Sequence, residues 1–172
     1  MSFNDQIVVK VRFVAHTMGV VGCEKSRNHW SIYLILEGEK SSVRLNMFLA
    51  DGGHEYGTFS VTQHAYAVSD SMLAYFDYRV CADLKVGHCL QLIQEKGRAG
   101  YRMTGSGNGC RHWVRTVFLD LAEKKYTLLS DDESNQFMQR IQNRYHRNKQ
   151  GQVEQIPDEM EIGEFVDFTG AI

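Results

Sequence analysis

The sequence lacks the features that define several classes of small protein. Its 172 residues include only one proline, Pro157, and none of its four cysteines forms a Cys-x-x-Cys pair. Zinc ribbons and thioredoxin-type redox sites therefore have no support. No apolar run reaches the roughly 18 residues of a membrane span, and the N-terminal residues show no signal-peptide pattern. We expect a cytoplasmic protein with reduced thiols, no membrane partner, no metal and no cofactor.

A strong excess of one charge is also missing. Lys and Arg total 19 and Asp and Glu total 21, so the net charge is −2, whereas a general polyanion binder is more basic. Residues 154–172 contain acidic side chains but neither Lys nor Arg. We therefore expect one mildly basic domain over residues 1–150 and an acidic C-terminal tail over residues 151–172. A chain of this length can bury a core without disulfides or metal.

Hydrophobic periodicity places strands in the first half of the chain and helices in the second. Strands are predicted over residues 7–14, 29–36, 42–49 and 56–66. Residues 70–82 fit either a strand or a short helix. Helices are predicted over residues 86–95, 110–125 and 131–147. These elements predict an α+β fold in which a small antiparallel sheet packs against helices.

A glycine-rich stretch over residues 97–109 leads into the second predicted helix. It lacks the Lys-Ser/Thr pair of a Walker loop and the glycine spacing of a Rossmann loop, so a nucleotide site is disfavoured. Cys110 follows it and begins the helix. There the helix dipole and unpaired backbone N–H groups are expected to lower the pKa of the thiol. The same N–H groups can stabilise an oxyanion.

A thiol nucleophile needs a base, and the base needs a group that orients its ring. His29 opens the most apolar strand, and Asn46 lies on the strand that follows. If these strands pair through the turn at residues 37–40, both residues lie near one edge of the sheet. The pattern predicts a Cys110, His29 and Asn46 triad. His112 is a poor alternative base, because helix positions two residues apart point to different faces.

Two short segments resemble a known enzyme group. His29-Trp-Ser-Ile-Tyr-Leu is similar to the histidine strand of the circularly permuted papain-like enzymes, and Gly-Asn-Gly-Cys110-Arg-His-Trp-Val is similar to their cysteine motif. That group includes the lecithin:retinol acyltransferase and NlpC/P60-like families. The resemblance implies a permuted papain-like arrangement, with the nucleophile at a helix N-terminus. The chain departs from the pattern by the extra Gly109, by Arg111 in place of Glu, and by lacking a membrane anchor.

A looser resemblance covers the whole chain. Its histidine strand, the Ser-Val-Arg-Leu-Asn46-Met strand and Gly-x-Gly-Cys110-Arg-x-Trp are similar to a large group of small fungal proteins. Through that group the chain resembles fungal enzymes that make arginine-containing cyclic dipeptides from aminoacyl-tRNA. The resemblance implies that the cysteine holds an aminoacyl group as a thioester, which an amine then attacks.

Together these patterns predict a cysteine-dependent acyl-transfer enzyme that acts on a small-molecule or aminoacyl donor. His29 would take and return the proton while Asn46 holds the imidazole. Substrate or oxyanion contacts are expected from Asn108, Gly109, Arg111 and His112. Transfer to an amine makes amides or peptides, including cyclic dipeptide synthesis from aminoacyl-tRNA. Transfer to water makes a thiol hydrolase, and a binding module without catalysis is the rival class.

Other ionisable residues have simpler interpretations. Arg140, Arg144 and Arg147 recur at helical spacing, so they predict one basic stripe on the third helix. Such a stripe is usually a solvated helix face. It could also contact a tRNA phosphate backbone or pair with the acidic tail. The cysteines at positions 23, 81 and 89 are expected to serve packing rather than chemistry.

Overall fold

The computed structural model describes residues 2–18, 28–50, 55–106 and 108–167. Within them, five strands form an antiparallel sheet in the order β4-β3-β2-β1-β5. These strands are β1 (Val8–Thr17), β2 (Asn28–Leu36), β3 (Ser42–Phe48), β4 (Thr58–His64) and β5 (Met72–Arg79). The helices are α1 (Val86–Glu95), α2 (Cys110–Glu123) and α3 (Asp131–Arg140), after a short 3-10 turn, η1 (Phe3–Asp5). The prediction of an α+β fold with a small antiparallel sheet is confirmed.

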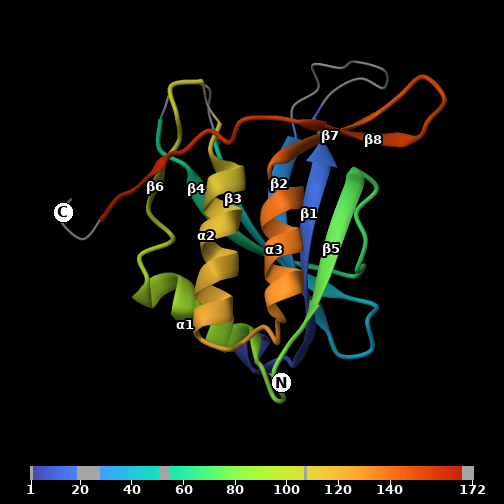
Figure 1. Cartoon of the computed structure of the whole chain (residues 1–172). Coiled ribbons are helices and arrows are strands. Elements are labelled where there is room, and N and C mark those ends of the chain that lie inside the picture. The colour runs from blue at the N-terminus through green and yellow to red at the C-terminus, as the bar shows by residue number, and fades with distance from the viewer. Residues whose placement is uncertain (1, 19–27, 51–54, 107, 168–172) are drawn as a thin grey trace.

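Two short strand pairs complete the described elements. Strand β6 (Tyr101–Arg102) pairs with β9 (Glu164–Phe165), and β7 (Asn143–Arg147) pairs with β8 (Val153–Pro157). The C-terminal segment therefore returns across the molecule instead of leaving it, and Figure 1 shows it passing over the ends of α3 and α2. No helix among the described residues is both long and apolar enough to cross a membrane.

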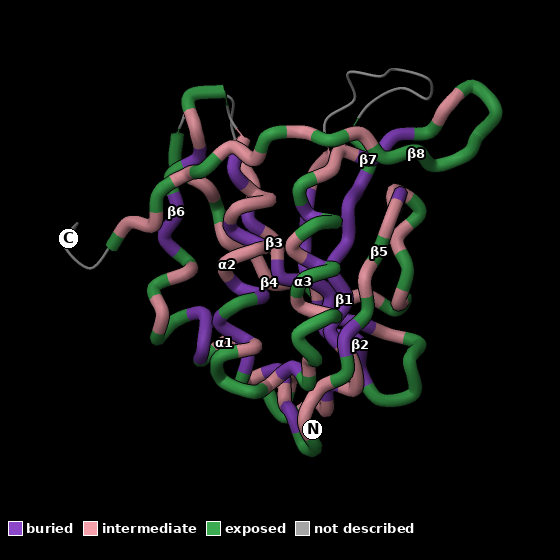
Figure 2. Tube along the Cα trace, in the orientation of Figure 1, coloured by how far each residue is buried: buried purple, intermediate pink, exposed green. Residues whose placement is uncertain are grey.

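Helices α2 and α3 lie side by side over one face of the sheet (Figure 1). Buried residues concentrate between these helices and the strands behind them (Figure 2). The rings of Phe118 and Phe137 stack at 3.9 Å between centroids, and Phe13 of β1 packs against both. This layer is the main hydrophobic core, and we refer to the covered side of the sheet as the helix face.

The opposite side of the sheet has a different character, and we call it the second face. Side chains alternate along each strand. On β2, Trp30, Ile32 and Leu34 join the main core, whereas Tyr33 and Ile35 form a small separate cluster with Val14. Residues 65–71 run over this face, since the side chains of Ser42 and Arg12 donate hydrogen bonds to backbone oxygens of that segment.

Most predicted elements agree with the structure. The helix predicted over residues 86–95 is α1 with the same bounds, and α2 begins at Cys110 as expected. The ambiguous segment contains the strand β5. Helix α3 begins after Ser130, which accepts a hydrogen bond from the backbone N–H of Glu133 as a cap. The acidic first turn of α3 favours this start.

The prediction of one helix over residues 131–147 is wrong in its second half. Helix α3 ends at Arg140, and residues 143–147 form the strand β7. Tyr145 is buried there between the rings of Trp30 and Phe76. Its backbone exchanges two hydrogen bonds with the side chain of Asn28, at 2.6 and 2.8 Å. These tertiary contacts outweigh the helical periodicity of the arginines.

Candidate active site

Cys110 begins α2 after a tightly packed turn. Gly109, the residue before it, has a φ of 136°, which residues with a side chain rarely adopt. A Cβ atom there would lie 3.1 Å from the ring of Tyr101. The Tyr101 hydroxyl donates a hydrogen bond to the Gly109 carbonyl at 3.0 Å. The glycine before Cys110 is therefore needed both for its backbone conformation and for its close approach to Tyr101.

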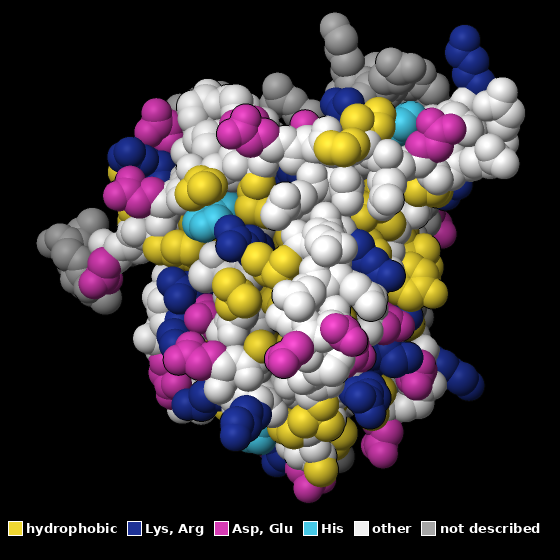
Figure 3. All heavy atoms as spheres, in the orientation of Figure 1, with side chains coloured by type: hydrophobic (Ala, Val, Ile, Leu, Met, Phe, Trp, Pro, Cys, Tyr) yellow, Lys and Arg dark blue, Asp and Glu magenta, His cyan; other side chains and the backbone are white. Residues whose placement is uncertain are grey.

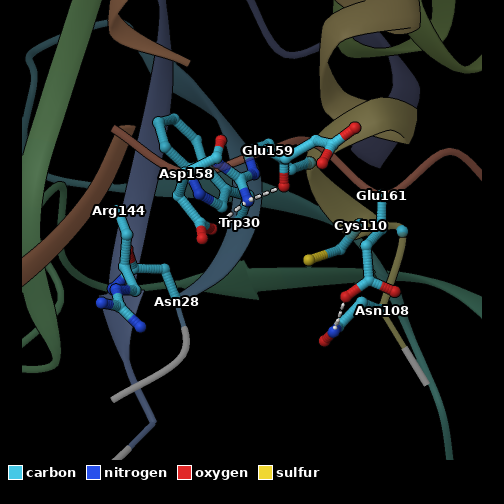
Figure 4. A pocket seen from close by; sticks show the side chains of 10 residues that line it. Asn28, Trp30, Asn108, Cys110, Arg144, Asp158, Glu159 and Glu161 are labelled. Carbon is cyan, nitrogen blue, oxygen red and sulfur yellow. Dashed lines mark hydrogen bonds and ion pairs between the residues drawn. The ribbon is translucent and has the colours of Figure 1, made fainter. Parts of the chain in front are cut away.

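A cavity of about 340 Å³ opens at the N-terminus of α2. Its volume lies at the lower end of the range for small-molecule sites, roughly 300–1,000 Å³. The Cys110 sulfur points into it, and the side chains around it are mostly polar or charged (Figure 4). The lining residues come from the start of β2, the turn before α2, β7 and the C-terminal segment: Asn28, Trp30, Asn108, Gly109, Cys110, Arg111, Arg144, Asp158, Glu159 and Glu161.

Two opposing effects act on the Cys110 thiol. Burial raises its pKa, whereas backbone hydrogen bonds from Trp30 and Arg111 and the charge of Arg111 lower it. Burial is the larger effect, so the thiol pKa lies above its usual value. The expected lowering by the helix start is present but outweighed. The thiol is therefore protonated at neutral pH, and its attack on a substrate requires a proton acceptor.

The C-terminal segment forms one wall of the cavity and is held there by its acidic residues. Arg111 donates a hydrogen bond to the Asp158 carboxylate at 2.6 Å. The Glu161 carboxylate accepts hydrogen bonds from the side chains of Thr104, Ser106 and Asn108. Sequence analysis found the acidic composition of this segment, but it did not find these partners. We call residues 158–161 the acidic strap.

His29 and Asn46 are brought together, but not with Cys110. The His29 Nε2 and the Asn46 Oδ1 lie 2.5 Å apart. Asn28 and Trp30, the neighbours of His29 on β2, line the cavity, whereas His29 does not. Since side chains alternate along a strand, the His29 ring points to the second face, where it lies 6.1 Å from the ring of His16. The structure thus separates the predicted base and its orienting residue from the predicted nucleophile.

The other predicted contact residues divide between several places. Asn108, Gly109 and Arg111 line the cavity. His112 does not, and its Nδ1 forms a hydrogen bond with the Tyr101 hydroxyl at 3.0 Å. Burial lowers the pKa of His112. The prediction that His112 is a poor base for Cys110 agrees with this placement.

The predicted basic stripe does not form on one helix, because α3 ends at Arg140 and the other two arginines lie on the strand β7. Arg140 lies at the end of α3 with its guanidinium 5.1 Å from the centre of the Phe76 ring. Arg144 is on β7 and lines the cavity, while Arg147 is exposed and donates to the Gly151 carbonyl. Arg144 is thus a cavity residue that sequence reasoning assigned to a helix surface. Its role depends on the turn at residues 141–142, which contains neither Gly nor Pro.

Among the described residues, the other cysteines do not suggest a second reactive centre. Cys89 is buried, and burial raises its pKa to about 12. Cys81 is partly buried, and Cys23 lies outside the described residues. Within the described parts of the chain, no group of three or more His, Cys, Asp or Glu is placed to hold a metal ion.

Comparison with known proteins gives one family. Residues 11–166 match the model of a domain of unknown function, DUF7770. No curated protein and no solved structure matches the chain. The matched range includes most of β1, the other four strands of the sheet, Cys110 and the acidic strap, so the cavity lies wholly within the family domain. The chain belongs to the DUF7770 family.

Proposed function

We propose that this protein is a cysteine-dependent acyl-transfer enzyme in which Cys110 is the nucleophile. One observation carries the proposal: the thiol at the start of α2 points into a polar cavity, where backbone hydrogen bonds from Trp30 and Arg111 act to lower its pKa against the larger effect of burial. A nucleophile and oxyanion donors at one point in a small-molecule cavity are the parts that acyl transfer needs. The resemblance to the permuted papain-like enzymes supports the same chemistry.

The reaction would pass through a thioester. The sulfur attacks the carbonyl carbon of an activated acyl donor, and the new C–S bond forms as the bond to the departing alcohol or thiol breaks. The departing group takes up one proton, which comes from the thiol through a base. The N–H groups near the sulfur stabilise the negative oxygen of the tetrahedral intermediate. An amine then attacks the thioester, forms the amide and returns the sulfur as a thiol.

This mechanism needs a group that accepts the proton of the Cys110 thiol. Among the described residues, no histidine lines the cavity. Asp158 is paired with Arg111, and Glu161 already accepts hydrogen bonds from three side chains. We propose that an amino group of the substrate takes the thiol proton, since an α-amino group has a pKa of about 7.7–8.0. This favours aminoacyl donors or amine acceptors over water.

The version that uses aminoacyl-tRNA rests on the fungal resemblance alone. The basic stripe that would have contacted tRNA is absent, because Arg140 ends α3 whereas Arg144 and Arg147 lie on the strand β7. A binding module without catalysis is the second candidate. The raised pKa of Cys110 and the position of His29 on the second face favour it.

Acyl trapping distinguishes these functions. The protein is incubated with a panel of small acyl thioesters and aminoacyl esters, and intact mass is measured before and after an amine is added. The proposal predicts one acyl adduct, mapped to Cys110, that the amine removes as an amide. Cys110→Ala should show no adduct, while Cys81→Ala, at a partly buried thiol outside the cavity, should behave as the wild type. Removal by water alone would indicate a hydrolase. Ligand binding without any adduct would indicate the binding module.

A further inference from the structure

Arg44 on β3 lies on the second face of the sheet, and its charge is not balanced by any described residue. Its neighbour on the same face, Arg12, forms a two-point ion pair with Asp77 at 2.6 and 2.8 Å and donates to the Ala67 carbonyl. Arg44 forms no ion pair with the described residues, and its Nε is buried without a hydrogen-bond partner there. Its Nη2 donates a long hydrogen bond, 3.5 Å, to the Asn46 Oδ1. A buried N–H donor without a partner is destabilising.

Among the described residues, the groups that sense the charge of Arg44 are neutral rings rather than carboxylates. The rings of His16 on β1, His29 on β2 and His64 on β4 all sense its charge, which lowers the pKa of each after the larger effect of burial. The Tyr33 ring lies 5.8 Å from the guanidinium. These neutral rings leave the charge of Arg44 uncompensated, so the arginine makes this region electropositive, which favours an anion.

Hydrogen-bond donors also converge at this point. The Asn46 Oδ1 accepts from His29 Nε2 and from Arg44, which assigns the Asn46 Nδ2 as the outward amide donor. The Arg44 position on β3 is paired with Tyr33 on one side and Thr62 on the other. Arg44 and Asn46, two residues apart on the same strand, therefore present N–H groups on the same side of the sheet. Guanidinium and amide N–H groups together suit an oxyanion.

We propose that the second face holds an oxyanion-binding site, in which Arg44 and Asn46 donate hydrogen bonds to a phosphate or carboxylate group of a small ligand. The site is separate from the Cys110 cavity, which lies on the helix face. This site gives the His29–Asn46 pair a role that does not involve Cys110. His29 holds the Asn46 side-chain amide so that the amide N–H groups are directed outward.

The test is a titration of the full-length protein with inorganic phosphate and, separately, with acetate, followed by the imidazole proton resonances of the histidines. The wild type should show saturable shifts of the His29 and His64 resonances with at least one of the two anions. Arg44→Gln should weaken that binding by about tenfold or more, the usual value of a charged hydrogen bond. Arg79→Gln, at an exposed arginine of the same sheet, should leave it unchanged.

A second variant keeps the proposal testable if Arg44→Gln does not fold. Asn46→Asp places a carboxylate between Arg44 and His29, so it should fill the site from within, raise the melting temperature and abolish phosphate and acetate binding. Equal binding by the wild type and Asn46→Asp would overturn the proposal. So would the absence of saturable shifts in the wild type with both anions, or binding that Arg79→Gln weakens as much as Arg44→Gln.

Discussion

The two faces of the sheet are stabilised by different chemistry. On the helix face, aromatic rings from β1, α2 and α3 pack together, and the Cys110 cavity opens at the end of α2. On the second face, a small apolar cluster is joined by hydrogen-bonded histidines and two arginines. Figure 3 views the molecule from the helix side, where hydrophobic and charged side chains are interspersed over the helices. Adjacent residues such as His29 and Trp30 thus belong to different faces, and closeness in a motif does not make a shared site.

The largest expected effect is a core substitution on the helix face. Phe137→Ala removes a fully buried ring that stacks on Phe118 and packs against Phe13. The lost burial and the resulting cavity should lower the free energy of unfolding by about 3–5 kcal/mol, measured by urea denaturation. Leu119→Ala, on an exposed position of α2, should change it by less than about 0.5 kcal/mol. A loss below about 1 kcal/mol for Phe137→Ala would contradict the packing described for this face.

The second face should respond to acid instead. Burial lowers the pKa of His16 to about 3, and its two ring nitrogens form hydrogen bonds with Ser71 and Ser31. Because the unfolded chain binds a proton near pH 6.5 and the folded chain does not, stability is full above that pH. It is lost as pH falls toward 3, by about 2 kcal/mol between pH 6.5 and pH 5 from this residue.

The measurement is the free energy of unfolding at pH 7 and at pH 5. His16→Gln should reduce the difference between the two free energies by about 2 kcal/mol. His88→Gln, at an exposed histidine of α1, should leave that difference as in the wild type. A pH dependence that is the same in the wild type and His16→Gln would show that the second face is not the acid-sensitive one.

A smaller effect is expected at the acidic strap. Glu161→Gln weakens the hydrogen bonds from Thr104, Ser106 and Asn108 to this partly exposed carboxylate, so unfolding should cost about 1 kcal/mol less. Loosening the strap should also speed alkylation of Cys110 by iodoacetamide several-fold, followed by peptide mass mapping. Glu164→Gln, in an exposed pair with Arg102, is the matched control and should leave the rate unchanged. An unchanged rate in both variants would mean that the strap does not limit access.

Local patterns predicted much of the fold, and long-range contacts account for the rest. Alternation and capping residues located four strands of the sheet, the whole of α1 and the start of α2 at Cys110, but they left β5 open between a strand and a short helix. The break at residue 141 was missed because Tyr145 is drawn into the core by Trp30, Phe76 and Asn28, which lie far away in the sequence. The acidic strap was missed for the same reason, since its partners Arg111 and Asn108 lie about 50 residues earlier.

Only part of the candidate site was predicted, because only part of it depends on local sequence. The glycine-rich approach to a helix start is a local signal, and it identified Cys110, Gly109 and Asn108 as neighbours. The face of β2 on which His29 lies depends on strand register, and a one-residue difference reverses it. Trp30, with its large apolar ring, faces the helices, and this places His29 on the second face.

We propose that Cys110 reacts in its own cavity and without His29. The most direct measurement is the initial rate of Cys110 acylation by a reactive acyl thioester, followed by intact mass in the wild type, His29→Gln and Cys110→Ala. The wild type and His29→Gln should acylate at rates within about twofold, because the His29 ring lies on the other face, and Cys110→Ala should not react. A folded His29→Gln protein that has lost acylation while the wild type retains it would show that Cys110 needs His29 to react.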